Sequence, residues 1–468
     1  MTTTSDPVSF DVIVVGAGPA GENAAGRCAD GGLSVAIVER ELVGGECTYW
    51  GCMPSKVLLR PGEVLAAARR VPGAAEAITG QLDIAKVLAK RNEAVENWDD
   101  KGQLPWLQEK GITLLRGTAR LTGERRLEVT SSSGEVTNLV AQKAVVLATG
   151  TGAVIPPIPG LRELRPWDNR SVTGASVVPS RLLVLGGGSI GVEMAQACSR
   201  LGSTSVTIIE GGARLVGREE PFAADELRTA LEAEGITVIT GVAMTAARRD
   251  EHGAVVVTLA DGPELVGDEI LVAVGRKPST SDIGLEAVGL KPGASVDVDD
   301  SLRATGVPGG WLYAVGDCNG RSLLTHMGKY QARIAGDVIL GKVAVASSDH
   351  SAVPRITFTD PQIAAVGLTE AQALERGIRV KAVRHGTGQV AGAYTMGTGG
   401  GGTSMLVVDE DRRVIVGATF TGPGVQEMLH AATIAIVGEV PMERLWHAVP
   451  SFPTVSEVWL RLLETYGL

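Results

Sequence analysis

The chain has few cysteines, few aromatic residues and no excess of positive charge. Its 468 residues include five cysteines and 4% aromatic residues, and 53 acidic residues outnumber 43 basic ones, for a formal net charge of −10. A protein that binds a nucleic acid backbone needs a basic field to release counterions, and one that stacks bases needs aromatic side chains. We therefore expect no nucleic acid partner. Five cysteines are also too few for the disulfide framework of a small secreted domain.

Long apolar runs are absent as well. No stretch is long and apolar enough to span a bilayer, and residues 1–10 lack the basic region and apolar core of a secretory signal. The sequence thus predicts a cytoplasmic protein without a membrane partner. In a reducing cytosol, a close cysteine pair favours a catalytic or metal-binding role over a structural disulfide.

Such a pair is present at Cys47 and Cys52. Two cysteines with four residues between them can form a disulfide that opens and closes with little movement of the backbone. A metal site is the weaker interpretation, because neither cysteine has a nearby cysteine or histidine to complete a tetrahedral ligand set. We therefore expect a redox-active disulfide and no metal site.

Glycine, by contrast, is abundant with 61 residues, and it marks an internal repeat. Residues 10–16 and 181–186 are short apolar runs that end in glycine, the pattern of a buried parallel strand. Each run opens a glycine fingerprint, which is followed by a helical pattern and a second apolar strand that ends in an acid. The fingerprint glycines are Gly16, Gly18 and Gly21 in the first copy and Gly186, Gly188 and Gly191 in the second, and the acids are Glu39 and Glu210.

Each copy has the features of a dinucleotide site. The first glycine makes a tight turn, the second lets the backbone approach a pyrophosphate, and the third allows helix and strand to pack closely. The helix N-terminus faces the anion, and the acid, 18 or 19 residues after the last glycine, receives ribose hydroxyls. Two glycine-rich turns in an ordinary α/β sheet are the alternative, which the doubled pattern disfavours. The sequence therefore predicts an α/β fold with two Rossmann-like dinucleotide-binding domains.

The two copies predict different cofactors. The first copy carries the cysteine pair, so we expect it to bind FAD, and the second would then bind the nicotinamide nucleotide. Glu210 would accept ribose hydroxyls and repel a 2′-phosphate, which favours NADH over NADPH. Arg214 and Arg218 lie nearby in the sequence and weaken that preference.

Changes in pattern divide the chain into domains. The Pro-rich stretch at residues 155–160 indicates a linker, and from about residue 351 alternating strand patterns are followed by helical ones. We predict an FAD-binding domain at residues 1–152 and 280–350, an NAD(P)-binding domain at residues 153–279, and a C-terminal α+β dimerisation domain at residues 351–468.

Several motifs together resemble one enzyme family. They are the cysteine stretch at residues 44–56, the strand end at 148–150, and the stretches at 275–278, 316–317, 324–326 and 358–370. This combination, spread over nearly the whole chain, resembles the class I pyridine nucleotide–disulfide oxidoreductases, which include dihydrolipoamide dehydrogenase and mercuric reductase. The resemblance implies an FAD-dependent NAD(P)H oxidoreductase that acts as a homodimer on a small-molecule substrate.

The resemblance also implies roles for individual residues. Cys47 would be the thiol that exchanges with the substrate, and Cys52 the inner thiol that contacts the flavin. Lys56 and Glu193 would form an ion pair beside the flavin atom that receives hydride, whereas solvated helix residues are the plainer alternative. Glu39 would bind the adenosine ribose of FAD and Asp317 its ribityl chain. The residues implied to bind the two cofactors are Gly16, Gly18, Pro19, Ala20, Gly21, Glu39, Arg40, Gly45, Lys56, Thr149, Gly150, Gly316, Asp317, Gly186, Gly188, Ile190, Gly191, Glu210, Gly275 and Arg276.

The remaining cysteines are expected to be packing residues. Cys28 and Cys198 follow the two fingerprints on their helices, and a buried free cysteine behaves as a small hydrophobe. Cys318 follows Asp317 and so would lie near the flavin, but packing is the favoured role there too.

One segment departs from the family pattern. Members that reduce disulfides carry a histidine acid/base in a His-Pro-Thr-x-Ser-Glu segment that reaches the partner's cysteines, and here Phe452 replaces that histidine while Glu457 is kept. Phenylalanine transfers no proton, and loss of a positioned acid/base costs about 10²–10⁴-fold in rate. His447, five residues earlier, is a possible substitute, although a surface histidine is the favoured interpretation.

Three activities remain open from the sequence. The first is electron transfer from NAD(P)H through FAD and the cysteine pair to a disulfide or other thiol-linked substrate. The second is an NAD(P)H dehydrogenase that reduces quinones, metal ions or dyes. The third, and least favoured, is a reductive carboxylation like that of the ketopropyl-coenzyme M carboxylase, which also has an aromatic residue in place of the histidine.

Overall fold

The structure is a computed structural model that describes residues 6–260, 262–397 and 401–468. Residues 1–5, part of the stretch expected to lack a secretory signal, lie outside the described residues. The chain divides into two compact units. The first comprises Met1–Pro54, Asn92–Ala153 and Arg276–His350, and the second comprises Ser55–Arg91, Val154–Gly275 and Ser351–Leu468.

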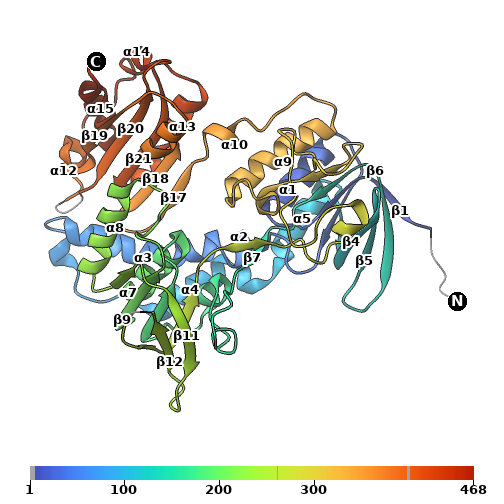
Figure 1. The fold of residues 1–468 in the computed structure, drawn as a ribbon, viewed down its shortest axis with the longest axis horizontal. Coiled ribbons are helices and arrows are strands. Elements are labelled where there is room, and N and C mark those ends of the chain that lie inside the picture. The colour runs from blue at the N-terminus through green and yellow to red at the C-terminus, as the bar shows by residue number, and fades with distance from the viewer. Residues whose placement is uncertain (1–5, 261, 398–400) are drawn as a thin grey trace. The chain divides into compact units, whose positions relative to one another are not determined.

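The first unit is built on a mostly parallel sheet. Strands β3 (Thr113–Arg116), β2 (Val35–Glu39), β1 (Val8–Val15) and β6 (Val136–Leu147) pair in that order, and β16 (Leu312–Ala314) also pairs with β6 in parallel. Strands β5 (Arg126–Thr130) and β4 (Thr118–Gly123) extend the sheet in antiparallel fashion. The C-terminal halves of β1 and β6, residues 12–15 and 144–147, are apolar because both faces of the sheet are buried there. Helices α1 (Pro19–Asp30) and α9 (Thr325–Ile339) pack against each other on this sheet (Figure 1).

The second unit contains the second copy of the repeat. Strands β10 (Thr237–Thr240), β9 (Ser205–Glu210), β8 (Arg181–Leu185) and β14 (Glu269–Val272) form a parallel sheet, which α7 (Ser189–Arg200) and α8 (Pro221–Ala233) pack against. A three-stranded antiparallel sheet of β11 (Met244–Arg249), β12 (Val255–Leu259) and β13 (Leu265–Gly267) follows. The long helix α3 (Cys52–Arg70) begins in the first unit and continues into the second.

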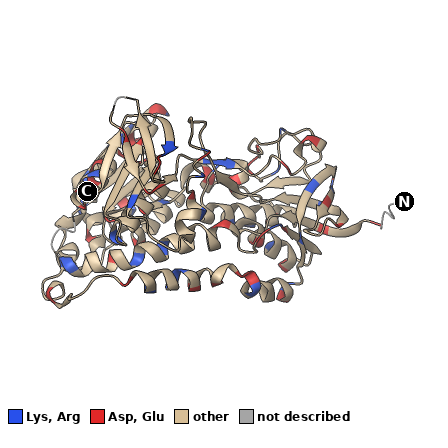
Figure 2. Ribbon diagram, turned by 90° about the horizontal axis from the view of Figure 1, so that it is seen from below, with Lys and Arg blue, Asp and Glu red and all other residues tan. Residues whose placement is uncertain are grey.

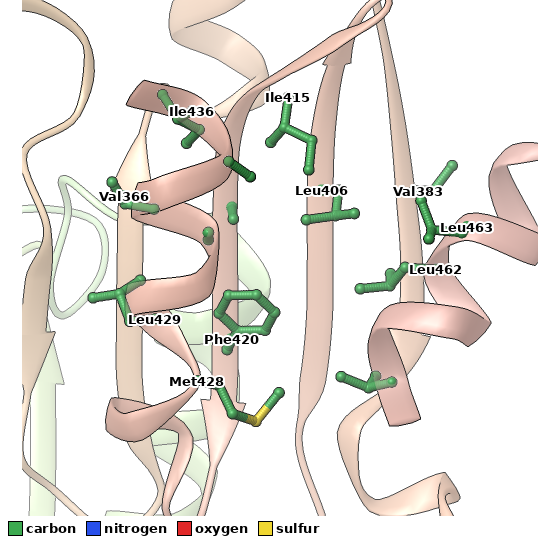
Figure 3. Close-up of a cluster of buried hydrophobic side chains, with 14 of the residues drawn as sticks. Val366, Val383, Leu406, Ile415, Phe420, Met428, Leu429, Ile436, Leu462 and Leu463 are labelled. Atoms are coloured by element: carbon green, nitrogen blue, oxygen red, sulfur yellow. The ribbon is translucent and has the colours of Figure 1, made fainter. Parts of the chain in front are cut away.

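The C-terminal part of the second unit has a core of its own. Strands β17 (Arg355–Thr357), β18 (Gln362–Gly367), β21 (Val414–Gly422), β20 (Thr403–Asp409) and β19 (Val380–Gly386) form an antiparallel sheet in that order. Figure 3 shows Leu429 and Ile436 of α13 (Leu429–Val437) and Leu462 of α15 (Val458–Tyr466) on this sheet, with Phe420 at its centre. The predicted α/β class, with two Rossmann-like domains and a C-terminal α+β domain, is confirmed.

Positions with positively and negatively charged residues are interspersed along the ribbon (Figure 2). Many form local pairs, such as Arg228 with Glu232 at 2.8 Å on consecutive turns of α8. Such exposed pairs contribute little to stability. Among the described residues, no helix combines the length and apolarity that crossing a membrane would require.

Candidate active site

The first fingerprint forms a tight turn between β1 and α1. Gly16 adopts a φ of +99°, and a Cβ there would lie 2.5 Å from the carbonyl oxygen of Ala148. A Cβ on Gly21 would lie 1.9 Å from the carbonyl oxygen of Gly16, so only glycine allows this approach of helix to strand. Gly18 precedes α1 as its N-cap and Pro19 is the first helical residue, with Ala20 behind it. The helix N-terminus therefore remains open toward an anion.

The acid after this turn is held in place by the turn itself. Glu39 ends β2, and its carboxylate accepts hydrogen bonds from the backbone N–H of Ala17 at 2.7 Å and of Glu41 at 2.7 Å. Arg40, the next residue, lies with Gly16 and Thr149 among the residues that line a small cavity of about 50 Å³. Three of the residues predicted to bind a cofactor thus line one cavity beside the fingerprint.

A second group of polar residues lies in the same unit, around Asp317. The Asp317 carboxylate accepts a hydrogen bond from the Thr151 hydroxyl at 2.6 Å, and that hydroxyl accepts one from Arg276 Nε at 2.7 Å. Burial raises the pKa of Asp317, although the hydrogen bond from Thr151 and the charge of Arg276 oppose the shift. The Thr149 hydroxyl is buried and has no hydrogen-bond partner among the described residues. This group therefore offers a buried acceptor and an unused hydroxyl beside Gly150 and Gly316.

The cysteine segment lies against the first fingerprint. Gly45, at the start of α2 (Gly45–Tyr49), comes so close that a Cβ on it would lie 2.7 Å from Gly18 Cα. Cys47 lies on α2 and Cys52 opens α3. A hydrogen bond with Cys52, together with burial, raises the pKa of the Cys47 thiol. The two cysteines are neighbours but are not joined by a disulfide in the structure.

A hydroxyl whose role the sequence did not reveal lies beside the thiol pair. Thr325, the first residue of α9, has its Oγ1 3.3 Å from Cys52 Sγ, and it lies within hydrogen-bond reach of Cys47 as well. Because 273 residues separate Thr325 from Cys52, no local pattern could reveal this contact.

The other three cysteines are buried. Burial raises the pKa of Cys28 and of Cys198 to about 12, and that of Cys318 to about 11. Cys318 donates to the backbone carbonyls of Leu147 and Val315, both at 3.4 Å. These environments are those of inert packing residues.

The second fingerprint repeats the geometry of the first. Gly186 has a φ of +110°, and a Cβ on Gly191 would lie 2.0 Å from the Gly186 carbonyl oxygen. Gly188 is the N-cap of α7, and Ile190 lies in its first turn. The Glu210 carboxylate accepts hydrogen bonds from the N–H groups of the residues at positions 187 and 212, at 2.6 and 2.5 Å. Gly275, with a φ of +139°, follows β14 in the same unit.

The predicted ion pair forms in the second unit. Lys56 on α3 and Glu193 on α7 are joined by a 2.7 Å contact between Nζ and Oε2. The Glu193 side chain is only 5% exposed, while that of Lys56 is 36% exposed. A buried carboxylate is costly unless it is paired, so the two side chains act as a unit rather than as solvated helix residues.

The C-terminal segment presents apolar side chains to solvent. Phe452 is 75% exposed, and Trp446 and Val449 are also exposed. Glu457 is buried; its Oε1 accepts a 2.7 Å hydrogen bond from Arg461, whereas Oε2 has no hydrogen-bond partner among the described residues. His447, the suggested substitute for the missing histidine, is an exposed turn residue.

Residues 10–334 match the pyridine nucleotide-disulphide oxidoreductase family, and residues 353–462 match the dimerisation domain of that family. The chain belongs to this family. Dihydrolipoyl dehydrogenase from Thermus scotoductus is 34% identical over 463 residues, which cover 97% of this chain and 97% of that protein. Mercuric reductase from Staphylococcus aureus is 30% identical over 465 residues, which cover 96% of this chain and 81% of that protein.

A solved structure gives the same result. The HOCl-induced flavoprotein disulfide reductase RclA from Escherichia coli, in its Cu(II) complex, has a TM-score of 0.85 and 25% sequence identity, and the match covers 97% of this chain and 99% of that one. As a family member, this protein is a flavoprotein NAD(P)H-dependent oxidoreductase with FAD and NAD(P)H as cofactors. Its dimerisation domain supports a homodimer.

The residues of the first unit fit FAD. Its glycine turn leaves no room for a Cβ, and the unused Thr149 hydroxyl and the buried Asp317 carboxylate match the polar groups of a bound polyol. Within residues 6–260, 262–397 and 401–468, no three His, Cys, Asp or Glu side chains are grouped so that they could hold a metal ion.

Proposed function

We propose that this flavoprotein uses Cys47 and Cys52 as a redox-active pair to reduce a disulfide or another thiol-linked substrate with electrons from NADH. The observation that carries the proposal is the hydrogen-bond reach between the two thiols. It is supported by the close approach of Gly45 to Gly18, which brings the cysteine segment to the first dinucleotide fingerprint. The proposed location is the cytoplasm, where such a pair is kept available for catalysis.

The thiol chemistry balances for a disulfide acceptor. The Cys47 thiolate attacks one sulfur of the substrate, the substrate S–S bond breaks, and the first thiol leaves with a proton. Cys52 then attacks the Cys47 sulfur, the second thiol leaves with another proton, and a Cys47–Cys52 disulfide remains. When bound, FAD would supply the two-electron relay from NADH by which this disulfide is opened again. The net reaction consumes NADH, one proton and one disulfide, and it yields NAD⁺ and two thiols.

Residues of this chain prepare the thiols for that chemistry. Cys52 lies at the N-terminus of α3, where the helix dipole favours a thiolate. The Thr325 hydroxyl can donate a hydrogen bond to the same sulfur. In the second unit, the Lys56–Glu193 pair would place a fixed positive charge where negative charge develops during hydride arrival.

The remaining proposed roles follow the two fingerprints. Glu39 and Asp317 would bind the ribose and ribityl groups of FAD, in a domain formed by residues 1–152 and 280–350. Glu210 would bind the adenosine ribose of NADH, in a domain at residues 153–279. Residues 351–468 would form the dimerisation domain.

In the proposed dimer, the C-terminal segment of the partner subunit completes each active site. The exposed apolar residues Trp446, Val449 and Phe452 support this assignment, because such side chains are disfavoured in water unless a partner covers them. Phe452 then occupies the place of a proton-transferring residue, and Glu457 lies in the same segment.

A second candidate function is reduction of metal ions, quinones or dyes. The exposed Phe452, which transfers no proton, favours it, because slow thiol exchange leaves other acceptors to compete. Relatives named mercuric reductase and a relative solved as a Cu(II) complex point to metal ions as one such class. Reductive carboxylation remains the least favoured activity.

Counting thiols before and after NADH tests the proposed function. We expect oxidised holoenzyme, denatured without oxygen, to show three reactive thiols, and the NADH-reduced enzyme to show five, since only Cys47 and Cys52 would change. Alkylation followed by peptide mass spectrometry measures which cysteines react. Five thiols in both states would contradict a redox-active pair.

Glu210 is expected to make the enzyme prefer NADH. Its carboxylate is fixed by two backbone N–H groups and would repel a 2′-phosphate, whereas Arg214 is engaged by the carbonyl oxygens of Gly217 and Glu219. We expect kcat/KM to be at least about 10-fold higher with NADH than with NADPH, a difference of about 1.4 kcal/mol. Glu210→Gln keeps a hydrogen-bond acceptor and removes the negative charge, so it should lower the ratio of kcat/KM with NADH to kcat/KM with NADPH. A higher kcat/KM with NADPH would contradict the assignment.

A further inference from the structure

The loop at residues 358–361, between β17 and β18, forms hydrogen bonds and ion pairs with two helices of the second unit. Gln196 on α7 accepts a hydrogen bond from the Asp360 N–H at 2.8 Å and donates one to the Asp360 carbonyl oxygen at 2.9 Å. The Asp360 carboxylate contacts Arg200 of α7 at 3.0 Å and Arg70 of α3 at 2.8 Å. Since the Asp360 side chain is only 11% exposed, these contacts fix the loop firmly.

The first residue of this loop touches both members of the ion pair. The backbone N–H of Phe358 donates to Glu193 Oε1 at 2.9 Å, while Glu193 Oε2 contacts Lys56. The face of the Phe358 phenyl ring lies against the same lysine, with Lys56 Nζ 4.5 Å from the ring centroid. One residue therefore holds the carboxylate through its backbone and the ammonium group through its ring.

We propose that Phe358 is a positioning residue that holds the Lys56 ammonium group in place for hydride transfer from NADH, an inference that rests on the role proposed above for the ion pair. The face of an aromatic ring attracts a cation within about 6 Å of its centroid. Lysine is otherwise a flexible side chain that loses rotamer freedom when it is held. The ring and the carboxylate each attract Nζ, so its charge is held in place before the reaction begins.

Two variants distinguish the effect of the Phe358 ring from that of its backbone N–H. Phe358→Leu leaves the N–H that binds Glu193 and retains an apolar side chain, but it removes the aromatic face. Phe358→Tyr retains that face. Phe222 provides a matched control, because it packs against the same hydrophobic cluster as Phe358 and also lies beside a cation, with Arg384 Cζ 5.0 Å from its centroid. Phe222→Leu therefore removes an equivalent ring that does not touch Lys56.

The test is anaerobic stopped-flow reduction of oxidised holoenzyme by NADH, without any disulfide acceptor. We expect Phe358→Leu to slow flavin reduction about 3- to 10-fold, and to raise the primary isotope effect with 4-deuterated NADH. Phe358→Tyr and Phe222→Leu should reduce at the rate of the unchanged protein. In the Lys56→Met background, Phe358→Leu should have no further effect, since the cation that the ring holds is gone.

A second measurement does not depend on the flavin. Acylation of Lys56 by an amine-reactive ester, quantified by peptide mass spectrometry, reports how firmly Nζ is held. We expect Phe358→Leu to increase Lys56 labelling at least about 3-fold, and Phe358→Tyr and Phe222→Leu to leave it unchanged.

Three results would overturn the proposal. The first is an unchanged rate of flavin reduction in Phe358→Leu, and the second is an equal loss of that rate in Phe358→Leu and Phe222→Leu. The third is a double variant, Lys56→Met with Phe358→Leu, whose loss of rate is the product of the losses in the two single variants. Failure of the proposed disulfide chemistry would give a different result: NADH would still reduce the flavin and the ring effect would persist, but no thiols would appear.

Discussion

Replacing Cys47 with serine is expected to lower NADH-dependent disulfide reduction at least about 1000-fold, the scale seen when a nucleophile is removed. A serine hydroxyl is far less acidic than a thiol, so no nucleophile forms for attack on the substrate sulfur. Dye reduction should stay close to that of the unchanged protein, since it needs only the nicotinamide and flavin sites. Steady-state assays with a small disulfide and with a one-electron dye measure the two activities side by side.

The control for this prediction is another cysteine of the same unit. Cys28 is fully buried on α1 and has no part in the proposed chemistry, so Cys28→Ala should keep both activities. Cys52→Ser should behave like Cys47→Ser with a disulfide, because the mixed disulfide could no longer be resolved. If Cys47→Ser and Cys52→Ser both reduced quinones at full rate and no disulfide at all were accepted by the unchanged protein, the second candidate function would replace the first.

The sequence predicted those parts of the molecule that depend on local rules. The glycines at positions 16, 21, 186 and 191 were recognisable because the turns that they form exclude a Cβ, with contacts as short as 1.9 Å in the structure. Glu39 and Glu210 could be placed because each ends the strand that follows its fingerprint helix. The resemblance to a family supplied the pairing of Lys56 with Glu193, which spacing alone does not reveal.

The contacts that the sequence did not predict join segments that are far apart in the chain. Thr325 meets Cys52 across 273 residues, and Phe358 meets Glu193 across 165 residues. Neither residue belongs to a periodic pattern that signals its role, because a loop residue and the first residue of a helix acquire their neighbours only when the fold is complete. Their functions could therefore be inferred only from distances.

Restoring a histidine at position 452 is expected to raise disulfide reduction about 10-fold or more. A positioned acid/base contributes about 10²–10⁴-fold, and an introduced side chain should recover part of that range. Glu457 favours recovery, because its buried Oε2 has no hydrogen-bond partner among the described residues and could accept one from an imidazole N–H. An imidazole that gains this partner is held in one orientation, which is what proton transfer to a departing thiolate requires.

The pH dependence distinguishes a new acid/base from a change in packing. Phe452→His should introduce an ionisation at or above about pH 6.5 into the kcat/KM profile for the disulfide, whereas Phe452→Leu, which also removes the ring, should not. Adding Glu457→Gln to Phe452→His should remove much of the gain, because the amide carries no charge to stabilise the imidazolium form. A gain in Phe452→Leu equal to that in Phe452→His would mean that the phenyl ring blocks the substrate. In that case the entrance to the cysteines, rather than proton transfer, would limit the reaction.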